Sequence, residues 1–303
     1  MLRNIGYKDS GADIAYTLQR KGISVLTPSA NPDPHQQEGW CFPDNEAGIL
    51  AAVQKGATHL WANTILFASH PLQTSSALAA YESQVYMVGQ PPSIVENLDD
   101  KAYLNGKLKQ MGSFTLPRSW LVTKSDHDLD AVLKALELPS DAYPIVGKPV
   151  RGRGSHGVQV CQDYAQLRAH LALLFDESPL VILEEYLAGK EATLTVMPPS
   201  PEYPRYWCLP PVCRFNHVDG IAPYNGTVAV TLNSHVVELE DQNTNTEHEQ
   251  YRAIMRECER VAEVIQTTAP IRIDIRQFGE RGPFALFDIN MKPVWFPQLA
   301  HGR

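Results

Sequence analysis

The strongest constraint on the fold lies near the end of the chain, where two short apolar segments follow each other. Residues 271–276 read Ile-Arg-Ile-Asp-Ile-Arg, and residues 284–290 read Phe-Ala-Leu-Phe-Asp-Ile-Asn. Residues 279–283, between them, contain two glycines and a proline. β-Branched and aromatic residues on both sides of such a turn predict two strands that form a β-hairpin.

The polar residues of this hairpin fall at alternate positions. Arg272, Asp274 and Arg276 therefore share one face of the first strand, and Asp288 and Asn290 share one face of the second. Carboxylate and amide oxygens suit a hard divalent cation such as Mg²⁺, which keeps several waters and binds substrate phosphates. The pattern indicates a metal site. The alternative is a half-exposed hairpin whose polar face meets solvent.

Composition limits the class of protein. The chain has 303 residues, of which 44% are hydrophobic and 20% are charged, so it can bury a large core in one to three domains. A net charge of −8 without a basic run disfavours a nucleic-acid partner. The five scattered cysteines indicate reduced thiols rather than a disulfide framework. Without an apolar run that could span a bilayer and without a signal peptide, we expect a cytoplasmic protein and no membrane partner.

Residues 1–92 are predicted to form a small α/β domain with a parallel sheet, because short apolar strands alternate with helices. A first helix is expected to begin at Asp9 or Ser10 and to end near Gly22. The other elements expected are strands at 23–26, 58–62 and 85–88 and a helix at 47–55. Met1 to Ile5 is a poor strand, so we expect this domain to be truncated at its N-terminal edge. The pair Pro91-Pro92 indicates the boundary.

Further helices and strands are expected beyond residue 92. Helices are expected at 99–111, 126–136, 164–175 and 247–266. The last of these carries the clearest apolar stripe: Tyr251, Ile254, Cys258, Val261 and Ile265. Besides the hairpin, strands are expected at 144–149, 158–161, 180–186, 191–197, 206–215 and 227–232.

A glycine-rich loop, Gly152-Arg-Gly-Ser-His-Gly157, follows the strand that carries Lys148. Glycines let a backbone approach a ligand closely and donate N–H groups to phosphates. The loop lies between two strands and lacks the Gly-Lys-Ser/Thr ending of a P-loop. Lys148, and Lys101 at the start of a helix, offer point charges for phosphate oxygens. The alternatives are a flexible hairpin loop and solvated surface lysines.

A second candidate segment is an apolar strand that ends in carboxylates. Residues 181–187 read Val-Ile-Leu-Glu-Glu-Tyr-Leu, and Glu191 follows shortly after. A strand end that turns outward can hydrogen-bond an adenine edge and a ribose hydroxyl. The alternative is an edge strand with charged ends.

The order of these motifs resembles the ATP-grasp enzymes, most closely the D-alanine–D-alanine ligase-like branch. The resemblance runs from about Asp100 to Pro293 and consists of two lysines, a glycine-rich hairpin, Glu-Glu-Tyr-Leu with a further Glu, Arg-x-Asp and Asp-x-Asn. It implies an α+β ATP-grasp fold with two subdomains, 93–188 and 189–303, that clamp ATP between them. The residues that it assigns to the nucleotide are Lys101 and Lys148 on the phosphates, Gly154, Ser155 and Gly157 in a closing loop, Glu184, Tyr186 and Leu187 at the adenine, and Glu191 at the ribose.

The same resemblance assigns Asp274, Asp288 and Asn290 to two Mg²⁺ ions, with Mn²⁺ as an alternative, and Arg272 to the reacting oxyanion. Lys148 and Ser155 join Arg272 as candidate catalytic residues. The implied activity is a carboxylate–amine ligase in which a carboxylate attacks the γ-phosphate of ATP and an amine then displaces phosphate from the acyl phosphate. The expected partners are small-molecule substrates, and a homodimer is compatible with the sequence. The alternatives are an intramolecular cyclo-ligase and a non-catalytic ATP-binding protein.

The chain departs from the family pattern at several positions. Asp288 stands where the family has Glu, and Met291-Lys-Pro-Val294 replaces small residues followed by Pro-Gly, which disfavours a D-Ala–D-Ala product. The polar loop 214–225 is a candidate for substrate choice, and an ordered surface loop is the alternative. Its candidate contacts are His217, Asp219 and Tyr224. His70 could line the cleft or cap a turn, and His156 could contact phosphate.

Overall fold

The computed structural model describes residues 5–62, 64, 66–90, 92–124, 129–139, 142–152, 155–223, 232–239 and 246–291. It separates into two compact units. One unit contains the described residues of Met1–Glu96 and Thr267–Ile271 together with Met291, and the other contains those of Asn97–Gln266 and Arg272–Asn290. None of the described helices is both long and apolar enough to cross a membrane.

The first unit combines helices with a two-stranded parallel sheet. Its helices are α1 (Ile5–Arg20), α2 (Glu46–Gln54), α3 (Pro71–Thr74) and α4 (Ser76–Ala79), and α5 (Pro92–Leu98) continues the chain into the second unit. The strands β1 (His59–Trp61) and β2 (Tyr86–Val88) pair in parallel. Both strands and α2 lie where the sequence predicts them. The Asn45 side chain accepts a hydrogen bond from the Gly48 N–H, which explains why α2 begins at this point.

Two predictions for this unit were wrong. The first helix does not begin at Asp9 or Ser10, because both residues lie inside α1. It does end near Gly22, whose positive φ of 80° suits a residue without Cβ. The predicted strand at 23–26 does not form. Ile23 and Leu26 are 53% and 41% exposed, and no described strand pairs with this segment. Val25 packs against the small cluster of Ala12, Ala15 and Trp40, but this contact does not supply the pairing that a strand needs.

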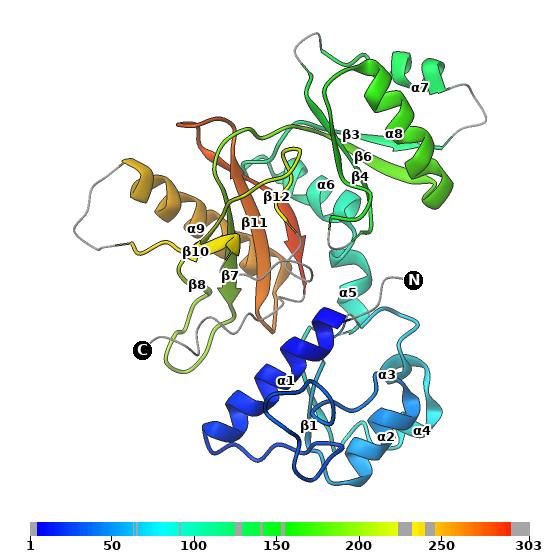
Figure 1. Ribbon diagram of the computed structural model, residues 1–303, viewed down its shortest axis with the longest axis vertical. Coiled ribbons are helices and arrows are strands. Elements are labelled where there is room, and N and C mark those ends of the chain that lie inside the picture. The colour runs from blue at the N-terminus through cyan, green and yellow to red at the C-terminus, as the bar shows by residue number, and fades with distance from the viewer. Residues whose placement is uncertain are drawn as a thin grey trace. The chain divides into compact units, whose positions relative to one another are not determined.

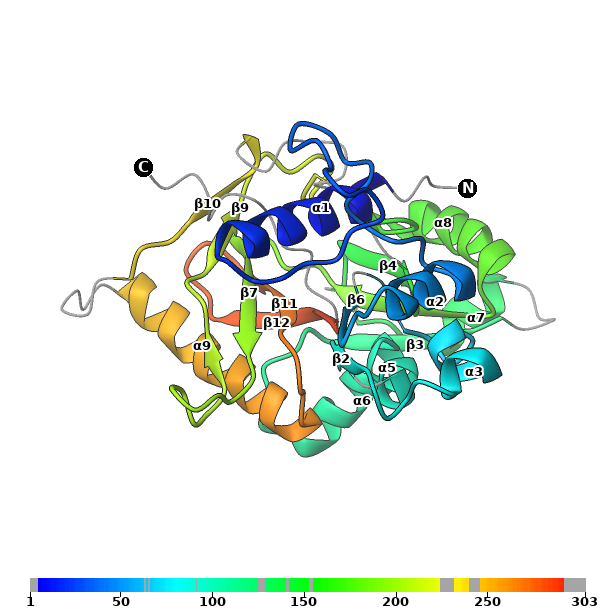
Figure 2. The same cartoon turned by 90° about the horizontal axis from the view of Figure 1, so that it is seen from below.

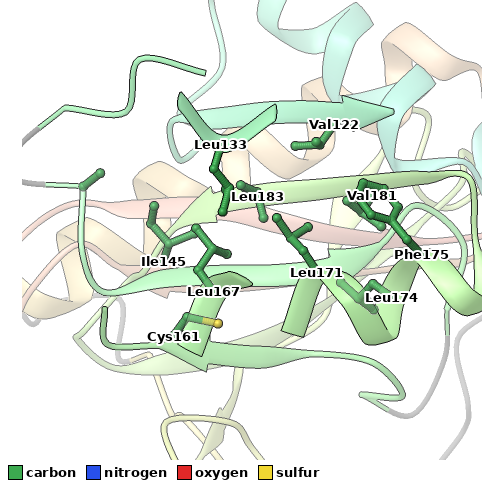
Figure 3. Close-up of a cluster of buried hydrophobic side chains, with 11 residues drawn as sticks. Val122, Leu133, Ile145, Cys161, Leu167, Leu171, Leu174, Phe175, Val181 and Leu183 are labelled. Carbon is green, nitrogen blue, oxygen red and sulfur yellow. The ribbon is translucent and has the colours of Figure 1, made fainter. Parts of the chain in front are cut away.

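The second unit contains an antiparallel four-stranded sheet in the order β3-β6-β4-β5. Its strands are β3 (Ser119–Thr123), β4 (Ile145–Pro149), β5 (Gln159–Cys161) and β6 (Leu180–Glu185), and its helices are α6 (Lys101–Met111), α7 (Leu129–Ala135) and α8 (Tyr164–Glu177). Three leucines of α8 pack on Val181 and Leu183 of β6 and on Ile145 of β4 (Figure 3), namely Leu167, Leu171 and Leu174. The sequence predicts all of these elements except β3, and residues 125–128 of the predicted helix 126–136 lie outside the described residues.

This core provides a direct test of the packing. Leu171 is completely buried in the cluster of Figure 3, whereas Leu173 on the same helix is 65% exposed. Replacing Leu171 by alanine is expected to lower the free energy of unfolding by about 2–5 kcal/mol, because it removes buried methyl groups and leaves a cavity. Urea unfolding would measure this loss. Leu173→Ala serves as the matched control, and an equal loss in both variants would contradict the assigned core.

A second sheet in this unit has the order β10-β9-β7-β11-β12, and β8 pairs with β7 outside this path. The strands are β7 (Glu191–Met197), β8 (Trp207–Cys208), β9 (Val212–Arg214), β10 (Ser234–Val236), β11 (Ile271–Gln277) and β12 (Phe284–Asn290). Helix α9 (Thr246–Ile265) lies along one face, against β7, β8 and β12 (Figures 1 and 2). Its predicted apolar stripe is buried there, and the Tyr251 ring lies 4.7 Å from that of Phe284.

The predicted long strand at 206–215 is wrong, because the structure divides it into β8 and β9. Pro210 and Pro211 lie between the two strands. Proline has no N–H to donate to a sheet, so it interrupts the pairing. Residues 227–231 of another predicted strand lie outside the described residues. Strand β10 was not predicted, because its Ser-His-Val segment is too short to show a strand pattern.

Candidate functional site

The polar residues of the closing hairpin gather on one face, as predicted. In the antiparallel pair β11–β12, Arg272 lies opposite Asn290 and Asp274 lies opposite Asp288. Directly opposed residues project on the same side of a sheet. The pairing shifts after Asp274, and Phe287 is left without a partner on β11. Such a bulge turns a backbone carbonyl out of the ladder, and the Phe287 carbonyl accepts a hydrogen bond from Lys148 Nζ at 2.9 Å.

Both oxygens of Asp274 are held by neighbours. The Thr193 hydroxyl donates to Oδ1 at 2.7 Å, and Arg272 Nη2 donates to Oδ2 at 3.0 Å. Burial raises the pKa of Asp274, against the opposing charge of Arg272, and the adjacent Asp288 raises it further. Two carboxylates on neighbouring strands in a buried site repel each other, so this face favours a cation.

Asp288 is compensated by three positive side chains. Burial by itself would raise its pKa, but Lys101, Lys148 and Arg272 outweigh this effect and hold the pKa of Asp288 below its ordinary value. Lys101 is the first residue of α6, and its Nζ lies 3.2 Å from Asp288 Oδ1. It also donates to the Gly152 carbonyl at 3.4 Å, so it joins the hairpin to the beginning of the glycine-rich loop.

Lys148 on β4 forms a buried ion pair. Its Nζ lies 2.6 Å from Glu184 Oε2, and the two side chains are 5% and 4% exposed. Burial raises the pKa of Glu184, and the charge of Lys148 opposes this shift. The other carboxylate oxygen of Glu184 accepts from Asn105 Nδ2 at 3.4 Å. The Glu184 carboxylate therefore contacts the lysine and the amide. The sequence reasoning, which placed it at the adenine, did not anticipate these contacts.

The glycine-rich loop is described at both ends, whereas Gly154 and Arg153 lie outside the described residues. Ser155 and Gly157 have positive φ angles of 59° and 67°, and Ser155 accepts a backbone hydrogen bond from Val158. The His156 ring lies 2.7 Å from Glu177, and both side chains are more than half exposed. In this structure His156 therefore contacts a surface carboxylate on α8, and its predicted phosphate contact stays a prediction.

Sequence reasoning missed a buried histidine beneath this loop. His170 Nε2 on α8 lies 3.2 Å from two carbonyl oxygens, that of Gly147 in β4 and that of Gly157 in the loop between β4 and β5. The Gly147 position is crowded, since a Cβ there would lie 2.7 Å from the His170 ring. The signal in the sequence was a histidine on the apolar face of a predicted helix. Its position indicates that it supports the base of the loop.

Replacing His170 by alanine is expected to loosen the loop. The change removes a donor that two buried carbonyl groups share, which typically costs about 1–3 kcal/mol. Amide hydrogen exchange over residues 155–158 should accelerate. His170→Gln retains a side-chain donor and should restore part of the protection, whereas His235→Ala, at an exposed position, should change nothing. Unchanged exchange in His170→Ala would contradict this supporting role.

Other predicted residues occupy distinct positions. Leu187 is buried. Glu191 contacts His217 and Arg276, and the Tyr186 hydroxyl accepts from Arg276. His70 accepts from the Leu72 N–H and so caps α3, which was one of its two predicted roles. Tyr224 and Val294 lie outside the described residues. No disulfide joins any two of the five cysteines in this structure.

The hairpin residues fit a hard cation that is also coordinated by the phosphates of a bound substrate. No group of three or more His, Cys, Asp or Glu residues with metal-binding geometry occurs in the part of the chain that the structure describes. The candidate set has two carboxylates and one amide, that of Asn290. Its buried Nδ2 has no hydrogen-bond partner among the described residues. Turning this amide over exchanges nitrogen for oxygen. So few protein ligands are typical of Mg²⁺ sites, which keep waters and take substrate phosphates.

Comparison with known proteins identifies the family of the chain. A family model described as D-ala D-ala ligase C-terminus matches residues 116–296, which is more than half of the chain. A D-alanine–D-alanine ligase of Syntrophotalea carbinolica is 36% identical over 59 residues. That match covers 20% of this chain, and this chain spans about a fifth (19%) of that relative's length.

Solved structures show the same fold at low identity. D-alanine–D-alanine ligase from Bacillus anthracis superposes with a TM-score of 0.62 at 16% identity over 98% of this chain and 85% of that one. The same enzyme complexed with ATP gives 0.56 at 18% identity, over 84% and 74%. VanG D-Ala:D-Ser ligase from Enterococcus faecalis gives 0.53 at 21% identity, over 72% and 58%.

These findings confirm the predicted fold class, an α/β domain followed by an α+β ATP-grasp fold. They also confirm the family resemblance that the order of the motifs indicated. The chain therefore belongs to the D-Ala–D-Ala ligase C-terminal domain family.

Proposed function

We propose that this chain is an ATP-dependent carboxylate–amine ligase that acts on amino-acid-like small molecules through an acyl phosphate. The observation that carries this proposal is the convergence of Lys101 and Lys148 on the face of the hairpin that presents Asp274 and Asp288. Lysines beside paired carboxylates can hold a polyphosphate together with its cation. The named relatives, which ligate D-alanine to D-alanine or D-serine, support the class of substrate.

The proposal assigns the nucleotide roles as the family resemblance implies them. In the proposal, Lys101, Lys148 and the loop with Gly154, Ser155 and Gly157 hold the phosphates. Because the Glu184 carboxylate contacts Lys148, Glu184 would act near the adenine by holding the end of β6 in place. Tyr186 and Leu187 would contact the adenine ring. Glu191 would accept a ribose hydroxyl. The division into 1–92, 93–188 and 189–303 remains part of the proposal.

Asp274, Asp288 and Asn290 would hold Mg²⁺, or Mn²⁺ in its place. When bound, such an ion neutralises charge on the phosphates of the nucleotide. The protein keeps this position available by burying two facing carboxylates and compensating them with lysines and arginine. Asp288 is a shorter ligand than the Glu of the family pattern, and the nearby Lys101 compensates part of its charge.

The proposed reaction has two steps. A substrate carboxylate oxygen attacks the γ-phosphorus, the bond to the bridging oxygen breaks, and ADP leaves. The amine nitrogen then attacks the acyl carbon, which gives a tetrahedral oxyanion, and passes a proton to water. The oxyanion re-forms the carbonyl as phosphate leaves with the electron pair of the broken C–O bond. Arg272 would stabilise the oxyanion of this tetrahedral intermediate, because preorganised donors act most strongly where negative charge develops. Positioning and charge neutralisation suffice for such transfer.

Phosphate release from a panel of carboxylic acids and amines tests this function. We expect ADP and phosphate only when an acid and a nucleophile are both present, and hydroxylamine should trap the acyl phosphate as a hydroxamate. Release with a single molecule that carries both groups would indicate the cyclo-ligase. ATP binding without turnover over a broad amino-acid panel would contradict catalysis and favour the non-catalytic alternative.

A further inference from the structure

Arg276 occupies the same face of β11 as Arg272 and Asp274 but serves a different group of residues. Its guanidinium donates through Nε to the Gly189 carbonyl at 3.2 Å, through Nη1 to the Gly220 carbonyl at 2.6 Å, and through Nη2 to the Tyr186 hydroxyl at 3.0 Å. It also lies 4.9 Å from the centroid of the Tyr186 ring. One planar side chain thus joins the connection between β6 and β7 to the loop after β9.

That loop contains a tight turn at residues 217–221, here called the 217–221 turn. Val218 and Ile221 exchange two backbone hydrogen bonds of 2.9 and 3.0 Å. Between them, Asp219 and Gly220 both have positive φ, 50° and 79°, as the Asp-Gly pair of a type I′ turn requires. A Cβ on Gly220 would lie 2.8 Å from the Tyr186 hydroxyl oxygen. The turn therefore lies directly against Tyr186.

The turn also reaches Glu191. His217 Nε2 lies 2.9 Å from Glu191 Oε2, and Arg276 Nη1 lies 3.5 Å from the same oxygen. The side chains of Glu191, His217 and Arg276 are 9%, 19% and 12% exposed, so solvent screens these contacts little. Within the described residues, no hydrogen bond reaches the other oxygen, Oε1. The two partners hold the carboxylate by one oxygen and leave the second as an acceptor.

We propose that His217 and Arg276 are positioning residues, which hold Glu191 through Oε2 so that Oε1 accepts a hydroxyl of the nucleotide's ribose. This inference rests on the proposed function and extends it to the 217–221 turn. A carboxylate with a fixed orientation favours a nucleotide that carries the hydroxyl over an analogue that lacks it, because the analogue leaves a buried acceptor unpaired. Loss of either positioning residue should therefore reduce ribose discrimination more than phosphate affinity.

Calorimetric titrations with ATP, 2′-deoxy-ATP, 3′-deoxy-ATP and inorganic tripolyphosphate test the proposal. We expect the unaltered protein to prefer ATP over one deoxy analogue by roughly 10- to 100-fold, the range of a hydrogen bond to a charged group. Glu191→Gln shows the preference that remains without the carboxylate. In His217→Ala and Arg276→Met, the preference for ATP over the deoxy analogue should fall toward the value of Glu191→Gln. Their affinity for tripolyphosphate should stay within about twofold of that of the unaltered protein. Arg281→Met, at an exposed position on the same hairpin, is the control.

The outcomes separate the two proposals. Unchanged ribose preference in both variants, with ATP still bound, overturns the inference alone. An equal loss of ATP and tripolyphosphate affinity also overturns it, because a general disturbance of the fold acts on both ligands. Failure of the unaltered protein to bind ATP overturns the proposed function and this inference with it.

Two milder changes cover the case in which Arg276→Met does not fold. His217→Gln retains a donor toward Glu191 and should recover part of the preference that His217→Ala loses. Gly220→Ala disturbs the turn through its positive φ and its contact with Tyr186, and should lower the preference without touching Glu191. Amide exchange of residues 217–221, measured without nucleotide, should accelerate in Gly220→Ala and His217→Ala. Unchanged exchange in both would overturn the assigned attachment of the turn.

Discussion

Replacing Lys148 by methionine is expected to lower the free energy of unfolding by about 3–5 kcal/mol and to abolish detectable ATP binding. The reason for the first effect is the buried pair with Glu184, at 2.6 Å and about 5% exposure. Removal of one partner leaves the other as an unpaired charge in a low-dielectric site. Glu184 would then take up a proton more readily, since burial already raises its pKa. Urea unfolding and calorimetry measure the two effects.

A double variant separates stability from binding. In Lys148→Met/Glu184→Leu, two apolar side chains replace the buried pair, and such replacements are often neutral or stabilising. We expect unfolding free energy to recover while ATP binding does not. Lys134→Met on α7, at an exposed position of the same unit, should change neither quantity. Normal ATP affinity in the stable double variant would exclude Lys148 from phosphate binding.

Arg272→Ala is expected to lower ligation by about 10²–10³ with ATP affinity little changed, which corresponds to about 3 kcal/mol of transition-state stabilisation. The structure adds a second consequence, because Arg272 also donates to Asp274 Oδ2 at 3.0 Å. Without this arginine, the Asp274 carboxylate loses the donor that holds Oδ2 in place, so the apparent affinity for Mg²⁺ should fall. Phosphate release at saturating Mg²⁺ measures the catalytic effect free of this contribution.

The comparison variants decide between the two roles of Arg272. Arg272→Lys keeps the charge near Asp274 but loses the planar fork, so it should restore Mg²⁺ affinity more than turnover. Arg281→Ala should behave like the unaltered protein. If raising Mg²⁺ restores full activity to Arg272→Ala, the arginine serves only the metal site, and its proposed contact with the oxyanion is wrong.

Local patterns predicted those elements whose stability depends on their own sequence. The stripe of α9 and the alternation of β11 each record which side faces the core, so the helix and the strand lie where expected. The strand predicted at 23–26 failed for the opposite reason. Ile23 and Leu26 are exposed, and no described strand pairs with the segment. Val25 packs on a small core cluster, but this contact does not replace a partner strand. Strand formation depends on pairing, which a short segment does not specify.

The features of the candidate site also separate into those that the sequence predicts and those that depend on the tertiary structure. By itself, the sequence determined the closing hairpin, the alternation that places Arg272, Asp274 and Arg276 on one face, and the order of motifs that indicated the family. Only the tertiary structure decided that Lys148 pairs with Glu184 and contacts the Phe287 bulge, and that His217 and Arg276 hold Glu191. These contacts join residues from different strands and loops, so they depend on sheet order, register and a bulge, and none of these is encoded in local spacing.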